Sequence, residues 1–281
     1  MTRWSASSRR LKIRSSINSR SSSLPGKICP KQIFPGSDVH GGFASHLRIP
    51  AAGLCPVPDL NDHAVNPQGI TLPSLSVLAD AVSTSYQAIH RSGLASGDLA
   101  VFIGAGGLGS FGVQVAAAMG AHVVAIDVSE ERLALVGSYG AALTLRADEL
   151  GFKELKGAIK GFAKDLGIPS YRQKIFETSG TDAGQTTAFG LMGHGGYLSV
   201  VGFTPKKVEI RLSNLMAFDA TAEGVWGCLP EHYPPIVDLV LAGKIVLDPF
   251  IEYRPLPTIN DVFEDLHAGR ISRRVILTPE G

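Results

Sequence analysis

The sequence predicts an α/β fold built around a doubly wound parallel sheet. Apolar strands alternate with helical segments from residue 99 to residue 202, the order that right-handed crossovers produce in parallel sheets. The runs Val101–Ile103 and Val123–Ile126 are apolar without a polar alternation, as expected when both faces of a strand are covered. The chain also holds 32 glycines, many of them clustered where strands are expected to end.

Within this region each strand is followed by a segment with helical spacing. The expected strands are Leu99–Ile103, His122–Ile126, Ala142–Leu145, Lys174–Glu177 and Tyr197–Gly202. The expected helices are Gly109–Met119, Glu130–Tyr139, Lys153–Leu166 and Thr181–Leu191. Residues 231–281 continue with a helix, a strand near Ile251, a helix over Ile259–His267 and a last strand over Arg274–Leu277.

The segments before this region carry other signals. Residues 1–26 are rich in Ser and Arg, without an acidic residue, which is typical of a mitochondrial transit peptide or of non-native sequence from a wrong start or an out-of-frame join. We favour the second reading and exclude these residues from the fold. Residues 38–59 are expected to form strand and turn, and residues 60–73 a loop. Ser74–Gly93 has helical spacing, with Ser74 as its cap.

Composition excludes several classes of protein. Hydrophobic residues make up 44% and charged residues 18%, a globular balance. The net charge of +1 does not favour a nucleic-acid partner, and no apolar run is long enough to span a membrane. Cys29, Cys55 and Cys228 are odd in number and far apart, which indicates reduced thiols and a cytoplasmic protein.

A glycine motif carries the functional prediction. Gly104-Ala105-Gly106-Gly107-Leu108-Gly109 follows an expected strand directly and opens an expected helix. In this context Gly104 makes the tight turn, Gly106 lets the backbone approach a pyrophosphate, and Gly109 lets the helix pack closely on its strand. The free N–H groups at the helix start would then face the phosphates. The pattern predicts a Rossmann dinucleotide-binding unit.

Asp127 ends the next expected strand, at the distance from the glycines that such units use for a ribose-binding acid. Its carboxylate would accept hydrogen bonds from the adenosine ribose and would repel a 2′-phosphate. The predicted cofactor is therefore NAD rather than NADP. The alternative is a glycine-rich turn in an α/β protein that binds no dinucleotide.

Five stretches of this sequence resemble the zinc-type medium-chain alcohol dehydrogenases. They are Gly41–Ala44, Asp80–Ala88, the glycine motif, Ala121–Asp127, and the tail from Leu241–Ile245 to Arg273–Leu277. The resemblance covers roughly residues 27–281. It implies a Rossmann domain over 81–230, inserted into a GroES-like β-barrel catalytic domain of which 27–80 and 231–281 are the remnant.

Within the family, the chain is most similar to the branch that oxidises 6-hydroxycyclohex-1-ene-1-carbonyl-CoA to its 6-oxo product in anaerobic benzoyl-CoA degradation. The residues that carry this similarity are Gln32–Gly36, Asp38–Phe43, Phe176–Thr181 and Val208–Asp219.

The resemblance also implies zinc, but most of the expected ligands are missing from this sequence. No Cys precedes Cys29 and no His precedes His40, whereas the family pattern places a catalytic Cys and His, and a lobe of four structural cysteines, in that part of the chain. One Cys cannot complete a tetrahedral site. Asp80 stands where the third catalytic zinc ligand lies in relatives, although it could equally be a surface acid of a helix. We therefore expect an impaired dehydrogenase that retains no zinc.

The remaining candidates are residues that the resemblance places near the nicotinamide and residues interpreted as structural. By resemblance, Val201, Gly202 and Phe203 would meet the nicotinamide amide, and Thr84 would lie near the nicotinamide. An ordinary strand end is the alternative for the first three. His90 and His194 are interpreted as structural, Cys228 as inert and Lys206-Lys207 as a solvated pair, so the sequence assigns no catalytic side chain.

The sequence therefore predicts an NAD-dependent dehydrogenase that acts on an acyl-CoA or another alcohol. Alternatives from other classes are a zinc-independent quinone or enoyl reductase and a non-catalytic NAD-binding fragment. We expect a homo-oligomer with no nucleic-acid or membrane partner.

Overall fold

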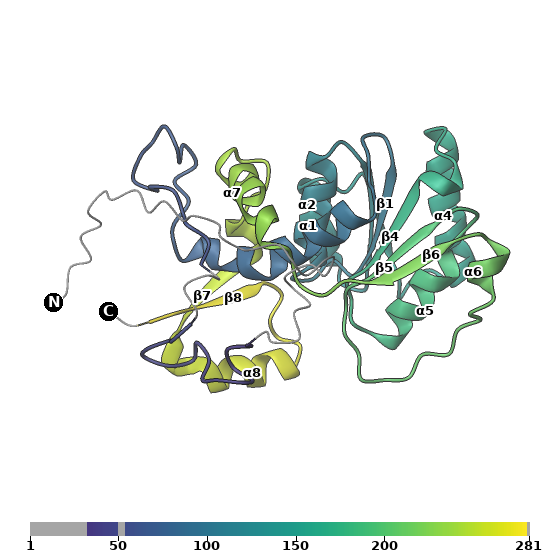
Figure 1. The fold of residues 1–281 in the computed structure, drawn as a ribbon. Helices are drawn as coiled ribbons and strands as arrows, with labels where there is room; N and C mark the ends of the chain where they lie inside the picture. Colours follow the sequence, from purple (N-terminus) through teal and green to yellow (C-terminus); the bar gives the residue numbers. More distant parts are fainter. Residues whose placement is uncertain (1–32, 50–53, 280–281) are drawn as a thin grey trace, which may run out of the picture.

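The computed structural model describes residues 33–49 and 54–279 of the chain. Its main body is a six-stranded parallel sheet with strand order β3-β2-β1-β4-β5-β6 (Figure 1). This is the order of a doubly wound dinucleotide-binding sheet, so the predicted fold class is confirmed. The strands are β1 (Leu99–Ile103), β2 (His122–Asp127), β3 (Leu143–Arg146), β4 (Gln173–Glu177), β5 (Tyr197–Val200), β6 (Thr221–Gly224), β7 (Ile251–Pro255) and β8 (Arg274–Thr278).

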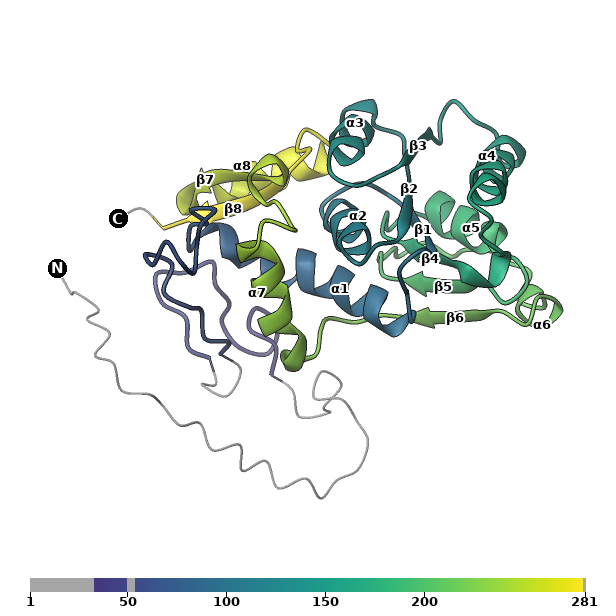
Figure 2. The same ribbon diagram turned by 90° about the horizontal axis from the view of Figure 1, so that it is seen from above.

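Helices cover both faces of the sheet. Figure 2 shows α1, α2 and α3 on one face and α4 and α5 on the other. The helices, with 3-10 helices marked η, are η3 (Ser74–Ala79), α1 (Ala81–Arg91), α2 (Gly109–Ala118), α3 (Glu130–Ser138), α4 (Phe152–Asp165), η4 (Ser170–Arg172), α5 (Asp182–Leu191), α6 (Asn214–Ala217), η5 (Pro230–His232), α7 (Tyr233–Leu241), η6 (Asp248–Phe250), η7 (Leu256–Thr258) and α8 (Ile259–His267). None of the helices in the described ranges is long and apolar enough to cross a membrane.

The central strand β1 shows why its sequence is apolar throughout. Ala100 and Phe102 pack into the core beneath α1 and α2, whereas Leu99, Val101 and Ile103 pack into the core beneath α4 and α5. All five side chains are buried. Successive side chains of a strand point to opposite faces, so a strand covered on both faces needs apolar residues at every position.

A second, smaller sheet lies beside the first. Strands β7 and β8 pair in parallel and are connected through α8. Both strands and α8 were expected from the sequence. The residue range 33–49 runs next to α8 (Figure 1), where the Phe43 and Phe263 rings meet edge to face at 5.9 Å.

Two expectations near the start of the chain are wrong. Residues 41–49 contain no strand, and the described part of residues 38–59 has only an isolated bridge between Pro35 and Val39. Alternation alone does not make a strand, because the backbone also needs a neighbouring strand to pair with, and β7 and β8 pair only with each other. Ser74 is not a helix cap, since its hydroxyl donates to the Thr71 carbonyl at 2.7 Å.

The single helix expected over Ser74–Gly93 is two helices. Asp80 has φ −140° and separates η3 from α1. Helix α6 and edge strand β6 were not expected. The sequence of β6, Thr-Ala-Glu-Gly, has neither apolar periodicity nor β-branched enrichment, and the strand forms because β5 offers it a parallel edge.

Gly112 generates a prediction about stability. A Cβ atom at this position of α2 would lie 2.4 Å from Cε1 of Phe102, a fully buried ring that stacks on Phe176. We expect Gly112→Ala to lower the free energy of unfolding by about 1–3 kcal/mol through overpacking, measured by urea unfolding of the full chain.

Gly157→Ala on α4 is the matched control, because no atom lies within 4 Å of the added Cβ. Here we expect a gain of about 0.5–1 kcal/mol from helix propensity. Equal stability of the two variants would contradict the close contact between α2 and β1.

Candidate functional site

A cavity of about 540 Å³ opens at the carboxyl ends of the central strands. Ile103 at the end of β1, Asp127 at the end of β2 and Ser179 just after β4 line it. The carboxyl edge of a doubly wound sheet, at the point where the strand order reverses, is where this architecture binds ligands. The cavity is therefore the candidate functional site.

The glycine motif forms the floor of this cavity through a tight turn. Gly104 has φ +98°, and a Cβ atom there would lie 2.7 Å from Cα of Ser179. At Gly109 an added Cβ would lie 1.8 Å from the carbonyl oxygen of Gly104. The Thr178 hydroxyl closes the turn by donating to the carbonyls of Ile103 and Gly104 at 3.0 and 2.8 Å. Only glycine fits at 104 and 109 without a rearrangement.

The middle of the motif faces the open cavity. Gly106, Gly107 and Leu108 line it, whereas Gly109 lies beneath it and is buried. A Cβ atom at Gly106 would have only the Arg132 guanidinium within 4 Å, at 3.9 Å. The absence of a side chain at Gly106 thus leaves space above the start of α2. Ser85 of α1 supports the motif from behind by donating to the Leu108 carbonyl at 2.8 Å.

Asp127 holds the motif in place from β2. Its carboxylate is only 8% exposed and accepts two backbone hydrogen bonds, from Ala105 N–H at 2.7 Å and from Ser129 N–H at 2.9 Å. A carboxylate has about four acceptor positions, so capacity remains on the side that lines the cavity. Asp127 therefore has a structural role in addition to any contact with a ligand.

Two arginines that the sequence analysis did not single out supply positive charge to the cavity. Arg132 comes from the first turn of α3 and Arg274 from the start of β8, and both line the cavity. Arg274 passes 3.4 Å from the position of a Cβ on Gly107. Its distance along the chain from the glycine motif explains why no local pattern indicates it.

Asp80 lies next to this cationic wall. One carboxylate oxygen forms an ion pair with Arg274, and the other accepts a hydrogen bond from the Thr84 hydroxyl at 3.2 Å. Thr84 is buried in α1. The structure thus joins Asp80 and Thr84 to each other and to Arg274, but neither Asp80 nor Thr84 lines the cavity.

This environment does not fit a zinc ion at Asp80. The Asp80 carboxylate is already paired with the positive guanidinium of Arg274, which would repel a zinc ion. Elsewhere in the described ranges, no three His, Cys, Asp or Glu side chains gather closely enough to hold a metal. Cys29 lies outside the described residues, and Cys55 is exposed.

The residues assigned to the nicotinamide follow β5 and do not line the cavity. Val201 and Gly202 donate backbone hydrogen bonds to the Glu177 carbonyl, both at 2.9 Å. A Cβ at Gly202 would lie 2.3 Å from the Gly180 nitrogen, and Phe203 is 83% exposed. The segment therefore packs against the loop after β4 and presents Phe203 to solvent.

Glu177 shapes that loop and was also missed as a site residue. It is fully buried, and its Oε1 accepts from the backbone N–H groups of Ser179 and Gly180 and from the Ser179 hydroxyl, at 2.9, 3.1 and 2.6 Å. Ser179 then contacts the turn at Gly104. Glu177 thereby links the end of β4 to the glycine motif.

The remaining candidates lie away from the cavity. His90 stacks with Tyr86 and makes a tilted ring contact with His232, and His194 meets Phe218 edge to face at 5.2 Å. Lys206 pairs with Asp182 at 3.2 Å. None of His90, His194, Lys206 or Cys228 lines the cavity, so the structure brings no histidine to this site from the described ranges.

Comparison with known proteins agrees with this architecture. Residues 107–242 match the zinc-binding dehydrogenase family. An alcohol dehydrogenase of Geobacillus stearothermophilus is 28% identical over 251 residues, which are 89% of this chain and 68% of that protein. L-threonine 3-dehydrogenase of Bacillus subtilis is 28% identical over 263 residues, covering 91% and 70% of the two chains.

Solved structures give the same result. The crystal structure of the alcohol dehydrogenase from Aeropyrum pernix superimposes with a TM-score of 0.76 at 27% identity, covering 91% of this chain and 70% of that one. Galactitol-1-phosphate dehydrogenase from Escherichia coli shares the fold with a TM-score of 0.77 at 24% identity, over 90% and 71% of the chains. The chain is therefore similar to zinc-binding dehydrogenases over residues 107–242 and to alcohol dehydrogenases over most of its length.

Proposed function

We propose that the cavity at the glycine motif binds NAD and that the chain is an oxidoreductase acting on CH–OH groups. The observation that carries the proposal is the combination of the open backbone at Gly106 with two arginines beside it. Free N–H groups at the start of α2 attract phosphate, and Arg132 and Arg274 add formal positive charge. When bound, NAD accepts a hydride from the substrate carbon.

In this proposal each residue has a defined task. Gly104 and Gly109 fix the turn, and Gly106 and Gly107 let the pyrophosphate approach the backbone. Asp127 accepts from the adenosine ribose hydroxyls with its remaining lone pairs, while its backbone contacts hold its orientation. Leu108 contributes a backbone carbonyl already bonded to Ser85, which keeps the motif rigid.

The residues proposed for the nicotinamide ring of NAD come from the family resemblance. We propose that Val201, Gly202 and Phe203 meet the nicotinamide and that Thr84 lies near it, as in the resemblance described above. Phe203 is exposed to solvent, whereas Gly202 packs against Gly180. No catalytic side chain is assigned.

We also propose that the chain divides into a cofactor unit over 81–230 and a catalytic unit over 27–80 and 231–281. All six strands of the main sheet fall within 99–224, and β7 and β8 form a sheet of their own. Arg274 of the proposed catalytic unit lines the cavity beside Gly107 of the proposed cofactor unit, so the two units meet there.

For the substrate we propose an alcohol that is oxidised to a ketone, with 6-hydroxycyclohex-1-ene-1-carbonyl-CoA as the specific candidate. The relatives named above are alcohol and L-threonine dehydrogenases, which supports the reaction class. The acyl-CoA rests on the stretches 32–36, 38–43, 176–181 and 208–219 of the sequence alone. Relatives use zinc for this chemistry, but since the described residues do not fit zinc, no step is derived through it.

A second candidate function is a zinc-independent quinone or enoyl reductase. The ion pair between Asp80 and Arg274 favours a zinc-independent reductase, because Asp80 is the one candidate zinc ligand and its carboxylate is already paired with a guanidinium. Both candidates use the same cofactor cavity and differ in the substrate and in the dependence on metal.

The preference for NAD is tested at Asp127. Removing the carboxylate in Asp127→Ala removes hydrogen bonds to the ribose and the repulsion of a 2′-phosphate. We expect NAD affinity to fall about tenfold or more and the ratio of NAD to NADP affinity to narrow, measured by fluorescence titration with the reduced cofactors.

Asp165→Ala is the control, because this exposed acid at the end of α4 lies outside the cavity. Tighter binding of NADP than of NAD by the unaltered chain would refute the argument from Asp127. A fall in NAD affinity that Asp165→Ala reproduced would mean that the loss is not specific to the ribose site.

The reaction is tested by assaying the purified full chain for NAD reduction with 6-hydroxycyclohex-1-ene-1-carbonyl-CoA and, separately, for NADH oxidation with a quinone or an enone. We expect chelator treatment and added zinc to change the rate less than twofold, because Asp80 is paired with Arg274. Activity that is lost on chelation and restored by zinc would show that the ion-pair argument is wrong. Turnover of the enone but not of the alcohol would select the second candidate.

A further inference from the structure

A second cavity, of about 460 Å³, lies at the opposite edge of the sheet from the glycine motif. It is bounded by α4, by Gln173 at the start of β4 and by the turn Met192–His194 that follows α5. Because the strands are parallel, their amino ends share this edge and their carboxyl ends share the other. The second cavity has no lining residue in common with the first.

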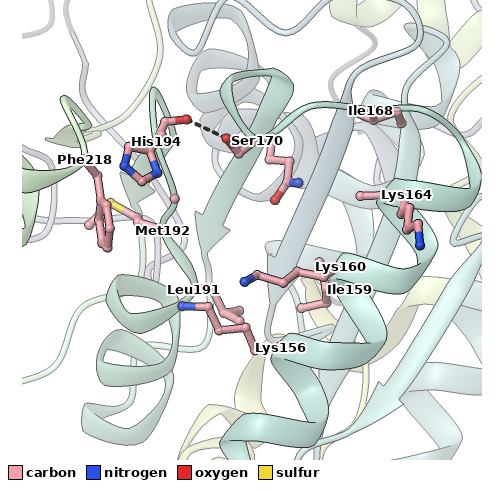
Figure 3. A pocket seen from close by; sticks show the side chains of 13 residues that line it. Lys156, Ile159, Lys160, Lys164, Ile168, Ser170, Leu191, Met192, His194 and Phe218 are labelled. Atoms are coloured by element: carbon pink, nitrogen blue, oxygen red, sulfur yellow. Dashed lines mark hydrogen bonds between the residues drawn. The ribbon is translucent and has the colours of Figure 1, made fainter.

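The floor of this cavity is apolar. Ile159, Ala163, Leu191 and Met192 are buried core residues that line it, and Phe218 forms part of the wall (Figure 3). The Ser170 hydroxyl donates to the His194 carbonyl at 2.8 Å and fixes the turn against η4. A concave site of a few hundred Å³ with apolar walls and a few polar groups is typical of small-molecule sites.

One side of the cavity is strongly basic. Lys156, Lys160 and Lys164 are spaced four residues apart on α4 and so lie on one face of that helix, and no acidic side chain lines the cavity. Lys156 Nζ donates to the Gly190 carbonyl at 2.7 Å. By contrast, the side chains of Lys160 and Lys164 form no hydrogen bond or ion pair with the described residues. Figure 3 shows Lys160 extending from α4 into the space in front of Leu191.

The three like charges repel one another. Burial lowers the pKa of Lys156, and the neighbouring charge of Lys160 lowers it further. A surface helix can carry such a row of lysines simply for solubility, but the exposed side chain of Lys160 also extends over the apolar floor of the cavity. An anionic group near Lys160 and Lys164 would relieve the repulsion, and an apolar group attached to it would cover the floor.

We propose that this cavity binds an organic anion with a flexible apolar tail, of the fatty-acid or alkyl-phosphate type. The carboxylate or phosphate head lies between Lys160 and Lys164, and the tail lies along Leu191, Met192 and Phe218. The site is separate from the cofactor cavity and takes a ligand of different chemistry.

The test uses the full chain and isothermal titration calorimetry with hexanoate, octanoate and decanoate, each below its micellar concentration. Affinity should rise about fourfold for each added methylene that is buried. Decyl phosphate distinguishes the two head groups. Decanol, which has the same tail without charge, should bind about tenfold more weakly than decanoate. A series without dependence on length, or decanol binding as well as decanoate, would overturn the proposal.

Variants locate the binding. We expect the double variant Lys160→Gln/Lys164→Gln to lower decanoate affinity about tenfold, and both side chains are exposed, so the fold should be unaffected. Lys153→Gln is the matched control, since Lys153 is an exposed lysine of α4 outside the cavity, and its effect should stay within twofold. Unchanged affinity in the double variant, or an equal loss in the control, would place the anion elsewhere and refute the site.

Discussion

The approach of Gly109 to the carbonyl oxygen of Gly104 is the constraint on which the cavity at the glycine motif depends. The chain leaves β1, turns within the motif and enters α2, and there is no room for a Cβ atom at Gly109. Because the turn is so tight, α2 begins at the end of β1 and its free N–H groups face the cavity. A looser turn would move the helix start away and leave the cavity without its backbone donors.

The constraint extends to neighbouring strands through hydrogen bonds between side chains and the backbone. Asp127 ties Ala105 to β2, and Thr178 ties Gly104 to the end of β4. Glu177 orders the next residues, which in turn contact the motif. Three adjacent strands therefore end in groups that are hydrogen-bonded to the glycine motif or to the loop that packs against it.

Most of the fold could be predicted because its signals are local. A few consecutive residues are enough to recognise the apolar runs of β1 and β2, the glycine motif and Asp127. Arg132 and Arg274 could not be predicted in the same way, because their importance comes from their approach to glycines that are far from them in sequence. Glu177 accepts hydrogen bonds from residues two and three positions later, but only the fold places that loop against Gly104. Strand β6 was missed for the same reason: its pairing with β5, and not its composition, makes it a strand.

The incorrect expectations arose where a local pattern lacked support from the rest of the fold. Residues 41–47 alternate like a strand, but nothing in the described structure pairs with them, so the local pattern has no tertiary support. Asp80 illustrates a different limit. The family resemblance made it a candidate metal ligand, and only the three-dimensional neighbourhood reveals the guanidinium beside it. The spacing of residues in a sequence does not reveal ion pairs between residues that are more than a hundred positions apart.

The placement of Arg274 on β8 has a consequence for how the site is assembled during synthesis. All strands of the main sheet and the whole glycine motif precede α8, so they leave the ribosome earlier and can pack while the last segment is still being made. Until β8 pairs with β7, Asp80 has no guanidinium beside it and the cavity lacks one of its two cationic walls. The nascent chain can therefore complete its sheet before β8 brings the second arginine to the cavity.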